Sequence, residues 1–215
     1  MSFFSKEEII QRMAEKRASE GSNVRADYNL ALIILGSALF EKRLKSGEDY
    51  GTHPVHVGMS NTRSLKKKIV GILHDVVEDS DWTLDDLRAV GFRAEIVDAV
   101  DAMTHREGEL YFDSIERAGL NLIGTDKKIE DLTHNMDMSR HYGMVSAKDV
   151  ERTNKYKISH AYLVGIKKGD VARGSRVIDF VRSSPLFAGD AEALRVALKY
   201  TTPPATPKAT GAPKP

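Results

Sequence analysis

The stretch Gly71-Ile-Leu-His-Asp-Val-Val-Glu-Asp-Ser-Asp81 places a histidine and several acidic residues inside an apolar segment. His74 and Asp75 are adjacent, Glu78 follows His74 by four residues, and Asp79 follows Asp75 by four. On a helix, residues four apart share a face, so this spacing gathers acidic groups on one patch. Such crowding of like charge is costly, and a divalent cation would relieve it. The stretch therefore predicts a metal site on a helix.

The alternative is an acidic helix end at the surface, which needs no ligand. This alternative does not explain the apolar neighbours of the His74–Asp75 pair, which place the pair near the core. Those neighbours are Ile72, Leu73, Val76 and Val77. Buried acids without a cation would be destabilising, so we favour the metal site.

The rest of the chain also has the pattern of helices. Ser5 with Glu8, and Thr83 with Asp86, have the spacing of helix N-termini. No segment shows sustained alternation with β-branched residues, which would indicate strands. The sequence predicts an all-α, compact multi-helix domain on one core over residues 1–200. Expected helices include 24–45, 53–60, 65–77, 93–103, 147–168, 171–182 and 189–200.

The last 15 residues, TTPPATPKATGAPKP (201–215), hold five of the seven prolines and no large apolar residue. Such a segment cannot bury enough surface to offset the entropy lost on ordering. We therefore predict a disordered C-terminal tail.

Composition excludes several classes of protein. The 215 residues include 32 Lys plus Arg and 31 Asp plus Glu, a net charge of +1, which does not favour general nucleic-acid binding. No cysteine is present, so disulfides, cysteine zinc ligands and a cysteine nucleophile are excluded. The N-terminus lacks the apolar core of a signal peptide, and the apolar stretch Leu30–Phe40 is too short to span a bilayer. We expect a cytoplasmic protein with no membrane partner; the oligomeric state is left open.

Two further segments carry candidate ligands. In Ser46–Val57, His53 begins a short helix and His56 follows three residues later; spacing alone does not choose between them, and either can be a packing residue. In Lys128–Asp137, Asp131, His134 and Asn135 share one helix face. That face can complete a metal site and contact a substrate, or it can be the solvated side of an amphipathic helix.

These three segments, in this order, resemble those of the HD-domain metal-dependent phosphohydrolases. In detail they are similar to the hydrolase domain of RelA/SpoT-type alarmone enzymes, which act on (p)ppGpp, and to its small stand-alone relatives. The segment SGEDYGTHPVHV resembles the family's SGEPY…HP..VA. The segment GILHDVVEDSDWTLDDLRAVGF resembles the family's ALLHDVVEDT…T…FG. The segment KKIEDLTHNM resembles the family's KLADRLHNM. The likeness covers roughly residues 27–140.

The resemblance implies specific roles. The residues implied to bind one divalent ion, typically manganese, are His53, His74, Asp75 and Asp131. Glu78 and Asp79 would act on the nucleophilic water, and Lys45, Ser46 and Asn135 would contact the substrate. The family's His-Pro position selects His53 over His56. Two imidazoles and two carboxylates form a mixed donor set that suits Mn²⁺, Fe²⁺, Zn²⁺ or Ni²⁺ better than Ca²⁺.

The resemblance also implies an activity: metal-dependent removal of the 3′ pyrophosphate of (p)ppGpp. Leu44 stands where the family has an arginine that packs against guanine, with Arg43 one residue away. Lys45 and, from its spacing, Arg140 could offset phosphate charge. Two alternatives stay open: hydrolysis of another nucleotide, such as a deoxynucleoside triphosphate or an NADPH-like molecule, and a catalytically idle nucleotide-binding regulatory module.

Overall fold

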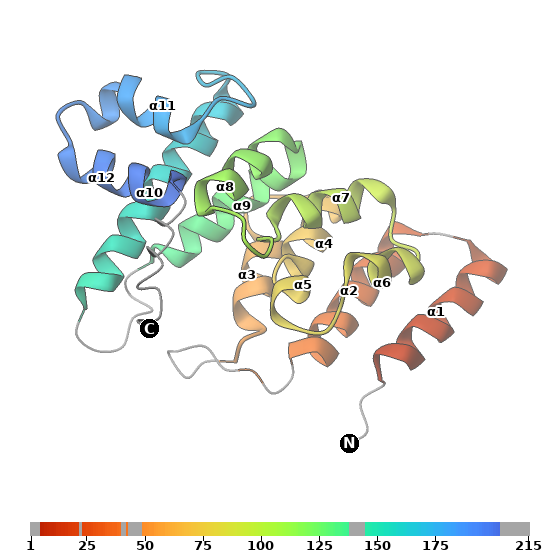
Figure 1. Cartoon of the computed structure of the whole chain (residues 1–215). Coiled ribbons are helices and arrows are strands. Elements are labelled where there is room, and N and C mark those ends of the chain that lie inside the picture. The colour runs from red at the N-terminus through yellow and green to blue at the C-terminus, as the bar shows by residue number, and fades with distance from the viewer. Residues whose placement is uncertain (1–4, 22, 40–41, 43–48, 138–144, 203–215) are drawn as a thin grey trace, which may run out of the picture.

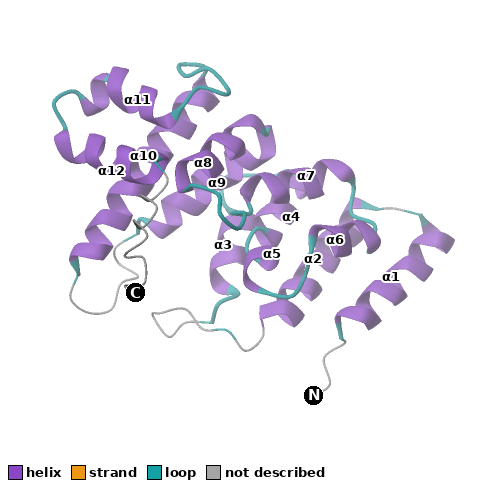
Figure 2. Cartoon of the chain, viewed as in Figure 1, coloured by secondary structure: helices purple, strands orange, loops and turns teal. Residues whose placement is uncertain are grey.

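The computed structural model describes residues 5–21, 23–39, 42, 49–137 and 145–202. The regular elements in these ranges are helices (Figures 1 and 2), which confirms the predicted all-α class. They are α1 (Lys6–Glu20), α2 (Val24–Leu39), α3 (Thr52–Met59), α4 (Leu65–Leu73), α5 (Val76–Asp79), α6 (Leu84–Ala89), α7 (Ala94–Met103), α8 (Tyr111–Leu120), α9 (Leu122–Asn135), α10 (Ala147–Lys168), α11 (Val177–Ser183), the short 3₁₀ helix η2 (Pro185–Phe187) and α12 (Ala191–Thr201).

Side-chain caps set several helix starts. Ser5 and Glu8 form the predicted capping box, in which the Glu8 backbone N–H donates to Ser5 Oγ at 3.2 Å. Thr83 caps α6 in the same way. Each box satisfies backbone donors that have no partner within the helix.

The helix expected over 24–45 corresponds to α2, Val24–Leu39, and residues 40–41 and 43–45 lie outside the described residues. Two other expected helices differ from the structure. The helix expected over 65–77 is broken at His74 and Asp75 into α4 and α5, because Asp75 has φ −93° and ψ −9°. The helix expected over 171–182 begins only at Val177, after two left-handed glycines, Gly169 and Gly174. Helix α12 includes Thr201, the first residue of the predicted tail, while 203–215 lie outside the described residues.

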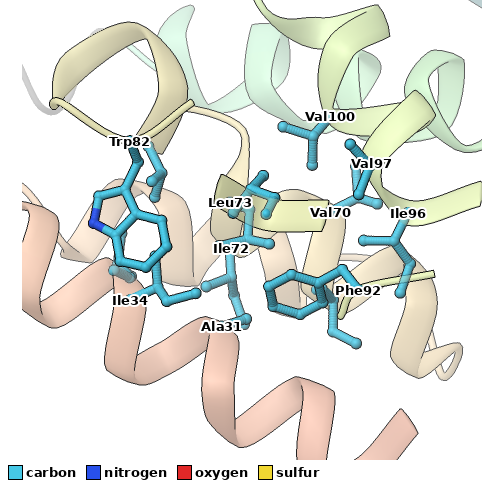
Figure 3. Close-up of a cluster of buried hydrophobic side chains, with 14 of the residues drawn as sticks. Ala31, Ile34, Val70, Ile72, Leu73, Trp82, Phe92, Ile96, Val97 and Val100 are labelled. Carbon is cyan, nitrogen blue, oxygen red and sulfur yellow. The ribbon is translucent and has the colours of Figure 1, made fainter. Parts of the chain in front are cut away.

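The buried apolar side chains form two clusters, where the sequence led us to expect one core. The first joins α1, α2 and α4–α7 and contains Ile34, Leu73 and Trp82 (Figure 3). The second joins α8–α12 and contains Leu132 and Tyr162. Helix α7 packs on both α8 and α9. Figure 1 shows α8 and α9 between the two ends of the molecule. None of the described helices is both long enough and apolar enough to cross a membrane.

Helices α3 and α4 cross at two glycines. A Cβ atom on Gly71 would lie 2.6 Å from the Cα atom of Gly58, and one on Gly58 would lie 2.7 Å from Ile72 Cγ1. Both distances are shorter than real contacts allow, so only glycine permits this approach. The crossing brings the helix that carries His53 close to the helix that ends before His74.

Replacing Gly71 by alanine should therefore separate the two helices. We expect Gly71→Ala to lower the free energy of unfolding by about 1–3 kcal/mol, because the added methyl group meets backbone that cannot move independently. Chemical denaturation of both proteins measures the difference.

Gly36→Ala is the matched control, since Gly36 lies within α2 and its added Cβ meets no atom within 4 Å. Alanine there should raise stability by about 0.5–1 kcal/mol. Equal stability of Gly71→Ala and the original protein would contradict the close crossing.

Candidate metal centre

Three side chains from separate helix ends meet at one enclosed point. His53 lies in the first turn of α3, His74 directly follows α4, and Asp75 precedes α5. One ligand atom of each lies within 4.8 Å of the others. Both histidines are buried and Asp75 is half-buried. These residues form a group that could hold a metal ion.

Asp131 reaches the same point from α9. Its Oδ1 atom lies 3.1 Å from His53 Nε2 and 3.7 Å from His74 Nε2. Asp75 Oδ1 lies 3.1 Å from His74 Nε2, and Asp75 Oδ2 lies 3.7 Å from His53 Nε2. Donors about 2.1 Å from one ion lie about 3.0 Å apart at a right angle and about 4.2 Å apart when opposite. Each histidine thus has oxygen atoms of Asp75 and Asp131 at distances that ligands of one ion would have, and His53, His74 and Asp75 form the group that could hold a metal ion.

Hydrogen bonding orients the His74 ring. Its Nδ1 atom lies 2.7 Å from the Gly71 carbonyl oxygen, which can only accept, so Nδ1 carries a proton. The Nε2 atom then faces the carboxylates; it is buried and makes no well-aligned hydrogen bond among the described residues, although Asp75 Oδ1 lies 3.1 Å away. A metal ion is the partner that this nitrogen fits.

The electrostatics of His74 favour a cation at this point. Burial lowers the pKa of His74, but the charges of Asp75 and Asp131 outweigh it and raise the pKa to about 9. The carboxylates that attract a proton to the imidazole attract a divalent ion to the same place, so metal binding would displace protons.

A second histidine lies behind His53. His134 Nδ1 is 2.6 Å from His53 Nδ1, so one ring donates to the other and His53 Nε2 points to Asp131. The His134 ring stacks on His53 and on His56, with ring centroids 4.9 and 3.9 Å away. His56 is exposed outside the ligand group. The structure thus favours His53 over His56 as the ligand, and it places His134, which shares a helix face with Asp131, against the His53 ring.

Asp131 is held by two further residues of α9. Lys128 Nζ lies 2.8 Å from Asp131 Oδ2, and Asn135 Nδ2 donates to Asp131 Oδ1 at 2.6 Å. Burial raises the pKa of Asp131, but the Lys128 ammonium and the two histidines hold it well below its usual range. Asn135, the predicted substrate contact, therefore contacts a candidate ligand. Lys128 was not among the predicted site residues, although its i,i+3 spacing to Asp131 is visible in the sequence.

Glu78, on α5, is bound to the loop before α8. Its carboxylate accepts a hydrogen bond from the His105 backbone N–H. Arg117 holds that loop, donating to the Thr104 carbonyl at 2.6 Å and to both carboxylate oxygens of Glu109 at 2.7 and 2.8 Å. Burial raises the pKa of Glu78, although the Lys128 charge and the His105 N–H oppose the shift.

Asp79 is bound on the other side of α5. It accepts a hydrogen bond from the Tyr50 hydroxyl, and Lys42 Nζ lies 3.3 Å from its Oδ1 atom. Burial and the Asp75 charge raise the pKa of Tyr50, so the hydroxyl remains a donor. The predicted substrate contacts Arg43, Lys45, Ser46 and Arg140 lie outside the described residues.

A buried lysine joins the two ligand-bearing helices α3 and α9. Lys127 is 1% exposed, and its ammonium donates to the carbonyl oxygens of Val57 and Ser60 at 2.9 and 2.8 Å. The backbone at the C-terminal end of α3 is thus tied to the helix that carries Asp131.

No model of a known protein family matches this chain, and the resemblance drawn from the sequence stays a prediction.

Added Mn²⁺ should stabilise the folded protein through this site. At a metal concentration about 100 times the Kd, the gain is about 2.7 kcal/mol, and chelator should remove it. His53→Ala should abolish the gain, whereas His56→Ala should keep it, because only His53 lies in the ligand group. Thermal unfolding with metal and with chelator measures the shift in stability. If the metal-dependent gain were lost in His56→Ala and kept in His53→Ala, His56 and not His53 would be the ligand.

Proposed function

We propose that this chain is a metal-dependent nucleotide phosphohydrolase that removes the 3′ pyrophosphate of (p)ppGpp. The observation that carries the proposal is the convergence of His53, His74, Asp75 and Asp131, which come from three separate segments. The sequence resemblance to HD-domain phosphohydrolases supports it, because that resemblance implies the same four ligands.

A bound divalent ion, Mn²⁺ in the proposal, would lower the pKa of a water molecule and polarise the scissile P–O bond. The chain's own residues would supply the rest. Glu78 would take the water's proton, and the burial that raises the pKa of its carboxyl group makes it a stronger base. Asp79, fixed by Tyr50, would orient the water. Attack on phosphorus then breaks the bond to the 3′ oxygen, which leaves with a proton from solvent.

A different nucleotide is the second candidate substrate. The observation that favours it is Leu44, which cannot stack on or hydrogen-bond to guanine as an arginine would. A deoxynucleoside triphosphate or an NADPH-like molecule would use the same ligands and the same two acids. The proposed metal chemistry is common to both candidates, while the base that is recognised differs.

A nucleotide panel separates these candidates. Release of phosphate and pyrophosphate is measured from guanosine alarmones, deoxynucleoside triphosphates and NADPH, with Mn²⁺ and with chelator. Pyrophosphate from the alarmones alone supports the first candidate, and metal-dependent turnover of another nucleotide supports the second. Metal binding without turnover of any of them would indicate an idle binding module.

Replacing Glu78 tests the proposed general base. Glu78→Gln should lower kcat about 10²–10⁴-fold while the Kd for Mn²⁺ changes little, because the amide keeps the shape but cannot take a proton. Glu107→Gln, in the exposed part of the loop that binds Glu78, is the matched control and should retain full activity. Unchanged turnover in Glu78→Gln would remove this residue from the mechanism.

A further inference from the structure

Lys155, in the first half of α10, lies among three tyrosine rings. Its Nζ atom is 3.8 Å from the ring centroid of Tyr111, 4.9 Å from that of Tyr200 and 5.5 Å from that of Tyr156. The rings come from α8, α12 and α10, so three helices fix the position of one ammonium group. We call this arrangement the tyrosine box.

Lys155 differs from the cations around it. Lys128 is paired with Asp131, Arg152 with Asp149 at 2.8 Å, and Lys199 with Glu151 at 2.5 Å. For Lys155, the described part of the chain offers no carboxylate within ion-pair distance. Aromatic faces attract an ammonium but do not neutralise it, so its charge remains available to an anion.

The surroundings of Lys155 are electropositive. Burial and the charges of Arg152, Lys128 and Lys199 together lower the pKa of Lys155 to about 8, although the Glu151 charge opposes the shift. A place where cations repel one another is a place where an anion is stabilised. About neutral pH the amine is still mainly protonated.

The tyrosine box lies beside the candidate metal centre. Helix α10 packs along α9, which carries Lys128 and Asp131. The charges of these two residues also act on the Tyr111 hydroxyl, whose ring lies under Lys155. An anion held by Lys155 would therefore lie near Lys128 and Asp131 on the neighbouring helix.

We propose that Lys155 binds a phosphate group of the substrate other than the one that is cleaved. This inference rests on the proposed function and adds to it a requirement for a second phosphate or diphosphate group. Lysine suits this task as a compact charge, and the rings restrict its freedom before the ligand arrives. A substrate with a single phosphate would leave the box empty.

Titration of inorganic pyrophosphate into the full-length, chelator-treated chain tests the inference without any turnover. Lys155→Met should weaken binding about tenfold or more, because a charge-assisted contact is lost while the apolar stem remains. Lys155→Arg should retain most of the affinity. Lys157→Met, on the exposed face of the same helix, is the matched control and should bind like the original protein.

Thermal unfolding of each variant shows whether the fold is kept. Unchanged pyrophosphate affinity in Lys155→Met, or no pyrophosphate binding by the original protein, would overturn the inference. Lys155 would then have only a structural role, in the packing of α8, α10 and α12. If a nucleotide is hydrolysed, Lys155→Met should raise KM with kcat nearly unchanged. If none is hydrolysed, the proposed function fails, and the pyrophosphate titration still decides the role of Lys155.

Discussion

Two aspartates and two imidazoles lie close together, with Asp131 buried and Asp75 half-buried, and the negative charge of these carboxylates must be balanced by their neighbours. A buried carboxylate requires opposite charge or hydrogen bonds. Asp131 receives both, from Lys128 and from the Asn135 amide. Asp75 has the imidazoles of His53 and His74 beside it, and these can accept a cation as readily as they hold a proton. The centre is thus arranged around a positive charge, and it could hold a metal ion.

The distances in this centre depend on how closely helices approach. The Gly58–Gly71 contact lets α3 lie against α4, and Lys127 ties the C-terminal end of α3 to α9. The same Gly71 supplies the carbonyl that fixes the His74 ring. A metal site loses affinity when its ligand atoms are a few tenths of an ångström out of place, so these more distant contacts would contribute to the binding of an ion here. Gly71 therefore has two roles: it permits the close packing of α3 on α4, and its carbonyl oxygen sets the tautomer of His74.

Local patterns predicted the helical class and a metal site at the His74–Asp75 pair, whereas the full set of four candidate ligands was implied by the resemblance. Helical periodicity and caps such as Ser5–Glu8 are local, and the apolar neighbours of His74 and Asp75 indicated burial. The choice of His53 over His56 depended on a resemblance, since three residues along a helix do not reveal which ring turns inward. The break between α4 and α5, the His134 ring behind His53 and the Arg117 contacts near Glu78 arise from tertiary packing. The residues in those contacts come from different parts of the chain, so no local sequence pattern reveals them.

The position of the centre between the two apolar clusters gives it a further consequence. His74 follows a helix of the first cluster, whereas Asp131 lies on a helix of the second. An ion held by both would join the two halves of the fold in addition to serving any chemistry, and its binding free energy would add to the stability of their packing. The tyrosine box belongs to the second half, because its residues lie on α8, α10 and α12. A substrate that contacts the ion and Lys155 together would thus bridge the same two halves, so that recognition of the ligand and alignment of the centre would reinforce each other.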